Sequence, residues 1–288
     1  MIIVSLFPVV FFKLKGQNSN ERREIRDFFE SGDFENSYNL SRDMLKGKPL
    51  DLLLLNIHGF SAYQLAIAQI NNFDTLSYIN DCIWSLRKAL LLSENSADSR
   101  IFYVLGKAYY YKGRGYADLA IKYLEKAGAA SYKARDIPEY LGLAYAAIGD
   151  YRGSVAAFTA ALTAGDDQNN SASDVLLLSI AKSYLALEEY DSAKAYLIHS
   201  LETSRDSKTI AAARILLGGI LAKSGDLSGA EAEYLKVLEE NEDTAELHYQ
   251  LGELYVLGGD TTRARAEWRR AVRIDPAYEP ARNRLNMQ

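Results

Sequence analysis

Residues 245–278, AELHYQLGELYVLGGDTTRARAEWRRAVRIDPAY, decide the fold of this chain. The stretch is 34 residues long, and its small and aromatic positions occur again one unit earlier. The pairs that lie 34 positions apart are Gly218 and Gly252, Gly225 and Gly259, Ala230 and Ala264, and Tyr234 and Trp268. A period near 34 is typical of arrays of helix-turn-helix units. The sequence therefore predicts an all-helical repeat protein.

Each recurring position has a packing reason. A glycine on the first helix lets the second helix approach closely, and an aromatic residue on the second helix fills the space between neighbouring first helices. A glycine after the first helix permits the left-handed conformation that ends it, and a following aspartate can cap the second helix. Four Gly-Asp pairs predict such turns: Gly32-Asp33, Gly149-Asp150, Gly225-Asp226 and Gly259-Asp260.

Residues 245–278 resemble the tetratricopeptide repeat family. The positions that match the family pattern are Leu251, Gly252, Tyr255, Gly259, Ala264, Trp268, Ala271 and Pro276. The resemblance implies an α-solenoid, a right-handed superhelix of about seven helix-turn-helix repeats. It also implies a role in binding other proteins, because the concave side of such arrays is the family's usual peptide-binding surface.

Weaker matches to the same pattern place the other repeats. We expect a hydrophobic N-terminal segment at 1–17, two divergent repeats with extended helices at 18–98, five repeats at 99–278, and a capping segment at 279–288. Residues 71–75 are expected to form the turn of the second repeat. Arg114 and Gly115 lengthen the turn of the third repeat, and the polar stretch 165–173 is expected to be a loop.

The N-terminal segment Met1 to Phe12 is almost wholly apolar and is followed by Lys13 and Lys15. It is shorter than the roughly 20 residues that span a bilayer as a helix. Three interpretations stay open: half of a membrane anchor, an interfacial segment, and a strand or helix that packs on the repeats. Localisation is accordingly either membrane-associated through the N-terminus or cytoplasmic.

The residue types that carry chemistry are sparse. The three histidines, His58, His199 and His248, lie in different repeats without metal-ligand spacing, and Cys82 is the single cysteine. We expect Cys82 to be a buried packing residue, and we expect no catalysis, cofactor or metal. The net charge of −5 disfavours binding to nucleic acid, which depends on neutralising phosphates with Lys and Arg.

One stripe on the first helices of the repeats is predicted to face the concave side and form a partner-binding groove. Its candidate residues are Phe60, Tyr63, Arg100, Tyr103, Lys107, Tyr110, Tyr111, Asp136, Glu139, Lys182, Lys223 and Tyr249. Tyrosine beside arginine and lysine is typical of interface hot spots. The alternatives are a merely polar surface and a groove filled by the chain's own N-terminal segment.

These observations predict a noncatalytic scaffold or adaptor that holds a peptide or helix of a partner protein, with membrane tethering through residues 1–12 as an option. The alternative is a self-assembling component of an oligomeric complex. The residues that clamp a carboxylate tail in some family members are not matched here, since Leu143 and Val175 stand at two of those positions. The partner's identity and the oligomeric state stay open.

Overall fold

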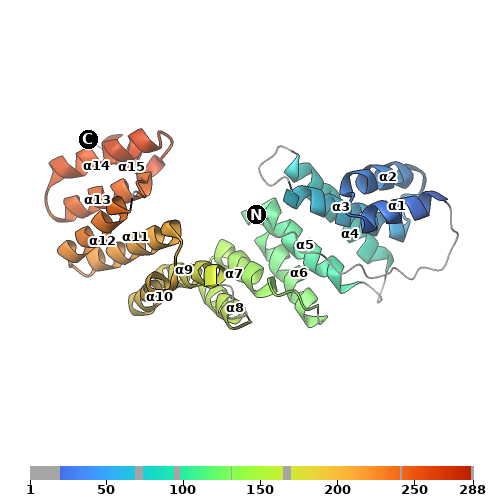
Figure 1. The fold of residues 1–288 in the computed structure, drawn as a ribbon, viewed down its shortest axis with the longest axis horizontal. Coiled ribbons are helices and arrows are strands. Elements are labelled where there is room, and N and C mark those ends of the chain that lie inside the picture. The colour runs from blue at the N-terminus through green and yellow to red at the C-terminus, as the bar shows by residue number, and fades with distance from the viewer. Residues whose placement is uncertain are drawn as a thin grey trace. The chain divides into compact units, whose positions relative to one another are not determined.

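The computed structural model describes residues 20–68, 74–93, 98–130, 132–164, 170–240 and 242–286, without the side chains of 164 and 170–173. These residues form fifteen α-helices and one 3₁₀ helix, and no strand occurs among them. The predicted all-α fold is therefore confirmed (Figure 1). The predictions for the N-terminal segment 1–17 lie outside the described residues.

The chain divides into two compact units, Met1–Gly149 and Asp150–Gln288. The first unit contains α1 (Asn20–Glu30), α2 (Phe34–Gly47), α3 (Leu52–Ala68), α4 (Thr75–Leu92), α5 (Ser99–Lys112), the 3₁₀ helix η1 (Arg114–Tyr116), α6 (Ala117–Ala129) and α7 (Ile137–Ile148). Helix η1 lies at the turn that Arg114 and Gly115 were expected to lengthen, which confirms that prediction.

The second unit contains α8 (Tyr151–Ala164), α9 (Asn170–Ala186), α10 (Tyr190–Thr203), α11 (Ser207–Lys223), α12 (Leu227–Glu239), α13 (Ala245–Leu257), α14 (Thr261–Ile274) and α15 (Glu279–Asn286). Within each unit, consecutive helices pack against each other, and α3, α5 and α7 also pack directly, as do α9, α11 and α13. The odd-numbered helices of each unit thus form one layer, and the even-numbered helices form a second layer that packs against it.

The predicted Gly-Asp turns are confirmed at the positions where helices end and begin. Gly259 has φ +81°, in the left-handed region that favours glycine, and Asp260 accepts a hydrogen bond from the Arg263 N–H at 2.9 Å. That bond satisfies one of the unpaired donors in the first turn of α14. The same left-handed glycine occurs at Gly32, Gly149 and Gly225.

Close approach of paired helices explains the other recurring glycine. A Cβ atom added to Gly252 of α13 would lie 2.3 Å from the indole nitrogen of Trp268 on α14. A Cβ on Gly218 of α11 would lie 2.4 Å from the ring of Tyr234 on α12. Both pairs, Gly218 with Tyr234 and Gly252 with Trp268, are among the positions that repeat after 34 residues. In each repeat, the glycine therefore lets the two helices pack closely around the aromatic ring.

Two helices begin earlier than the sequence indicated. The stretch 165–173 was expected to be a loop, but α9 already begins at Asn170, while 165–169 lies outside the described residues. Helix α11 begins at Ser207, 11 residues before Gly218, whereas α13 begins 7 residues before the equivalent Gly252. Asp206 accepts a hydrogen bond from the Thr209 N–H at 2.9 Å and so caps the additional turn.

The second repeat has the extended helices that the sequence predicted. Helices α3 and α4 are 17 and 18 residues long, and every residue of α3 from Leu53 to Tyr63 is buried. Of the turn expected at 71–75, residues 71–73 lie outside the described part of the chain, and Thr75 already belongs to α4. None of the helices in the described ranges combines the length and apolarity that membrane crossing requires.

Candidate functional site

The predicted groove residues of the first unit gather on α5 and at the start of α7. Residues three and four apart on a helix share a face, so Tyr103, Lys107, Tyr110 and Tyr111 lie along one side of α5. Helix α7 packs beside α5 and brings residues 136–140 to that side. We call this set, with Tyr140 included, the α5–α7 face.

A hydrogen-bonded triad forms the centre of the α5–α7 face. The Tyr103 hydroxyl donates to both carboxylate oxygens of Asp136, at 2.9 and 2.8 Å, and the Lys107 ammonium lies 2.7 Å from the same carboxylate. Burial, followed by the negative charge of Asp136, raises the pKa of Tyr103, so its phenol stays a neutral donor. The polar groups of Tyr103, Lys107 and Asp136 therefore bind mainly to one another.

Aromatic rings extend the α5–α7 face beyond the triad. The hydroxyl groups of Tyr111 and Tyr140 lie 2.6 Å apart, and Tyr110 meets the Tyr140 ring edge-on with centroids 5.2 Å apart. The Lys107 ammonium lies 4.2 Å from the centroid of the Tyr140 ring, within cation–π range. The sequence analysis missed Tyr140 because this residue comes directly after Glu139 and is not itself a position of the predicted stripe.

Glu139 differs from its neighbours because the described residues give it no hydrogen bond and no ion pair. Its side chain is half-buried, and burial raises its pKa, with the nearby Asp136 adding to the effect and Lys107 opposing it. A half-buried carboxylate of this kind can accept a cation or a donor from a ligand. Glu139 is thus the predicted groove residue whose interactions the fold leaves least satisfied.

The groove residues contributed by α3 lie beneath this surface. Phe60 and Tyr63 are only 8% and 1% exposed. Burial raises the pKa of Tyr63, and the phenols of Tyr111, Tyr103 and Tyr140 add to the effect. Arg100 lies over the Phe60 ring at 5.9 Å. These residues support the α5–α7 face from within.

Three predicted residues belong to the second unit. Lys182 of α9 is exposed. Lys223 at the end of α11 donates to the Tyr190 hydroxyl at 3.1 Å and lies over that ring at 5.0 Å. Tyr249 of α13 packs against Tyr278. The structure does not join them into a cluster with one another.

Two other residues that the sequence singled out are structural. Cys82 is fully buried, and burial raises the pKa of its thiol, which confirms the packing role expected for it. His248 of α13 is buried with Nδ1 at 2.5 Å from Glu267 and Nε2 at 2.7 Å from Asp243. Across the described ranges, the structure brings together no cluster of three or more His, Cys, Asp or Glu side chains suited to a metal.

Comparison with known proteins agrees with the repeats. The family model described as "Tetratricopeptide repeat" matches residues 178–243 and 217–279. No curated protein matches the chain significantly by sequence. The matched residues cover α10 to α14, where the sequence pattern was strongest.

Solved structures extend the likeness over most of the chain. The C-terminal part of a repeat-containing protein from Cytophaga hutchinsonii is 16% identical, with 92% of this chain and 100% of that chain covered and a TM-score of 0.61. A tetratricopeptide repeat protein from Parabacteroides merdae is also 16% identical, with 93% and 98% covered and a TM-score of 0.59.

A third similar structure is PilW, a type IV pilus biogenesis factor. It is 17% identical, with 79% of this chain and 98% of that chain covered and a TM-score of 0.59. At these identities the likeness concerns the fold. Residues 178–279 match the tetratricopeptide repeat model, and the solved structures together with the helix pairs described above show that the chain has the tetratricopeptide repeat fold.

Proposed function

We propose that this protein is a noncatalytic interaction scaffold and that its α5–α7 face binds a peptide or helix of a partner protein. Tetratricopeptide repeat proteins are generally scaffolds of this kind, which supports the broad class. The observation that carries the specific site is the concentration of the half-buried Lys107, Tyr110, Tyr111 and Tyr140 beside Glu139, whose carboxylate has no hydrogen bond or ion pair among the described residues.

The chemistry of the α5–α7 face suits a partner segment with both an apolar and a basic side chain. Tyr110 and Tyr140 offer rigid rings that bury area at little entropic cost. Glu139 offers a carboxylate that is already partly desolvated, so a lysine or arginine of the partner gains more from it than from an exposed carboxylate. Tyr103 and Lys107 hold Asp136 in place and thereby set the position of α7.

The test is a quantitative pulldown with the double variant Tyr110→Ala/Glu139→Lys. A matched control, Tyr116→Ala/Asp118→Lys, makes the same changes at exposed positions of η1 and α6. We expect one or more partners that the wild type and the control retain to be lost from the first variant. An identical set of partners from all three proteins, with circular dichroism unchanged, contradicts the proposal.

The alternative, self-assembly, is favoured by the outer side of α4. Leu76 and Leu91 are exposed there, Leu91 to 82%, and exposed apolar groups of this kind are typical of contact surfaces. Sedimentation velocity over a range of concentrations tests it, because a strict monomer excludes it. Loss of assembly on Leu91→Ser would assign the contact to α4.

Membrane tethering is a separate proposal that rests on the apolar residues 1–12. Removing residues 1–17 should release the protein from a membrane fraction if this segment anchors it. An unchanged distribution between membrane and supernatant contradicts the tether.

A further inference from the structure

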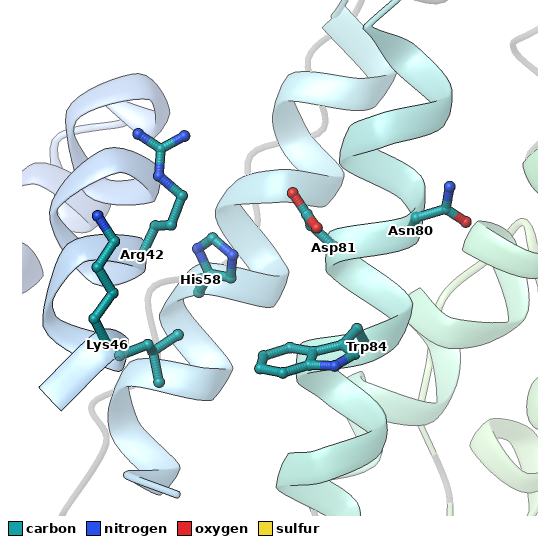
Figure 2. Close-up of a pocket in the computed structure, with 7 residues that line it drawn as sticks. Arg42, Lys46, His58, Asn80, Asp81 and Trp84 are labelled. Atoms are coloured by element: carbon teal, nitrogen blue, oxygen red, sulfur yellow. The ribbon is translucent and has the colours of Figure 1, made fainter. Parts of the chain in front are cut away.

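A second candidate binding site lies between α2 and α4, away from the α5–α7 face. A hollow of about 460 Å³ opens there, with α3 as its floor (Figure 2). Arg42 and Lys46 of α2 line one wall, Asp81 and Trp84 of α4 line the other, and His58 of α3 lies between them. This volume is within the range of roughly 300–1,000 Å³ that is usual for small-ligand sites.

His58 presents a hydrogen-bond acceptor at the floor. Its side chain is 4% exposed, and Nδ1 lies 3.1 Å from the Ser41 hydroxyl and 3.3 Å from the Tyr38 carbonyl oxygen. Ser41 donates its own hydrogen to the Ser37 carbonyl at 2.7 Å, so Nδ1 is the donor toward Ser41. Burial lowers the pKa of His58, and a neutral ring with its proton on Nδ1 leaves Nε2 as an acceptor.

Asp81 presents a second acceptor, this one charged. The Tyr38 hydroxyl donates to one carboxylate oxygen of Asp81 at 2.6 Å, and the Tyr38 ring stacks on His58 with centroids 4.6 Å apart. No other hydrogen bond reaches Asp81 from the described residues. Its second oxygen is therefore available to a donor in the hollow, while the first bond holds the carboxylate in position.

The opposite wall carries two cationic side chains, of which the described residues pair only Lys46 with a carboxylate. Within the described ranges, Arg42 has no carboxylate partner, and its guanidinium lies over the Tyr38 ring at 5.5 Å. The pair of Lys46 with Asp43, the one that the described residues give it, is an exposed contact of 2.8 Å that contributes little. A carboxylate that enters beside α2 would meet both cations.

Trp84 supplies the apolar part of the site. Its side chain is 49% exposed, and Figure 2 shows the indole reaching from α4 toward α2, below His58 and Asp81. The Lys88 ammonium lies 3.8 Å from the ring centroid, within cation–π range, and occupies one face of the indole. Leu45 of α2 also lines the hollow.

We propose that the hollow between α2 and α4 binds a ligand that carries both a cationic group and a carboxylate. The cation lies against Trp84 and donates to Asp81 and His58, while the carboxylate pairs with Arg42 and Lys46. A purely cationic ligand is repelled by α2, and a purely anionic ligand is repelled by Asp81. Two kinds of ligand have this chemistry. One is a free amino acid or dipeptide, and the other is a protein segment with a basic side chain next to an acidic one.

The two tryptophans make a direct measurement possible. In a ¹⁵N-labelled full-length sample, the indole signals of Trp84 and Trp268 report on the hollow and on the α13–α14 core. The probes are lysyl-glutamate with free termini, the same dipeptide acetylated and amidated, and putrescine and glutarate as single-charge probes. We expect saturable shifts of the Trp84 signal alone, with binding at least about tenfold tighter for a dipeptide than for either single-charge probe.

The relative affinity of the two dipeptides distinguishes these two kinds of ligand. Tighter binding of the free dipeptide assigns the site to small ligands, and tighter binding of the blocked one assigns it to a protein segment. Absence of a Trp84 shift with both dipeptides, or equal binding of putrescine or glutarate, overturns the proposal.

Variants tie the binding to the named groups. Asp81→Asn keeps the acceptor for Tyr38 but removes the charge, and Arg42→Gln changes an exposed residue without a carboxylate partner in the described structure. Each should weaken dipeptide binding by about tenfold, whereas Lys122→Gln on exposed α6 should leave it unchanged. Wild-type affinity in Arg42→Gln, which is expected to fold normally, contradicts the assignment.

Discussion

The Tyr103 hydroxyl donates to both carboxylate oxygens of Asp136, 33 residues away, and thereby connects α5 to the residue before α7. Replacing Tyr103 with Phe removes this donor and leaves the partly buried Asp136 carboxylate with Lys107 as its one partner among the described residues. We expect Tyr103→Phe to lower the free energy of unfolding by about 1–3 kcal/mol in urea denaturation. Tyr110→Phe is the control, because no hydrogen bond of the Tyr110 hydroxyl occurs among the described residues. Equal stability of the two variants would show that the Tyr103 bond contributes nothing.

Substitution by alanine should lower stability at glycines in helix contacts, whereas at glycines on open helix surfaces it should leave stability unchanged or raise it. Gly252→Ala places a methyl group 2.3 Å from the Trp268 indole nitrogen, so either the indole or the two helices must shift. We expect a loss of about 1–3 kcal/mol and a shift in Trp268 fluorescence.

Gly128 of α6 is the matched control for Gly252. Nothing lies within 4 Å of a Cβ added there, and alanine is the better helix former. Gly128→Ala should therefore leave stability unchanged or raise it by up to about 1 kcal/mol. Destabilisation by both substitutions to a similar extent contradicts the close-approach explanation.

The buried His58 should make the first unit less stable in mild acid. Burial lowers its pKa in the folded state below the ordinary value of 6.5, so between these two pKa values the unfolded chain binds more protons. Stability is therefore lost as the pH falls below about 6.5. Arg42 and Asp81 face the ring from α2 and α4, and they oppose each other in their effect on it.

His58→Gln isolates this contribution. The variant should lose less stability than the wild type between pH 7 and pH 5.5, even if it is less stable at pH 7. The measurement is thermal unfolding at several pH values, followed through helical circular dichroism. Parallel pH curves for the two proteins would show that His58 does not titrate differently on folding.

The thiol of Cys82 should report the opening of the first unit. It is fully buried on α4, and burial raises its pKa, so both access and thiolate formation are suppressed in the folded protein. Reaction with a disulfide reagent should be slow in buffer and accelerate across the urea transition. A Ser77→Cys variant, which places a thiol at an exposed position of α4, should react at once. Rapid reaction of the wild type without urea contradicts this burial.

Residues that act locally were predictable. Gly259 and Asp260 end one helix and begin the next through their own backbone and side chain, and the 34-residue spacing carries Gly252 to Trp268. Even the early start of α11 is a local effect, since Asp206 caps its extra turn through Thr209. The sequence analysis missed it because it placed the repeats by the family pattern.

The candidate sites depend on distances that the sequence does not contain. Tyr103 and Tyr110 belong to the same predicted stripe, yet one is tied to Asp136 and the other keeps its hydroxyl free of such a bond. Tyr63 was expected on the surface stripe but is only 1% exposed. Asp81 lies 43 residues from Tyr38, and no short pattern joins them.

The sequence by itself determined the helices, their turns and the pairs of residues that set the contact between them. These follow from backbone preference, capping and a fixed repeat, which act over a few residues or over one period. Only the tertiary structure decided which polar groups are satisfied inside the protein and which remain free for a ligand. That outcome depends on how neighbouring repeats bring distant side chains together, and the helix pattern is the same for either result.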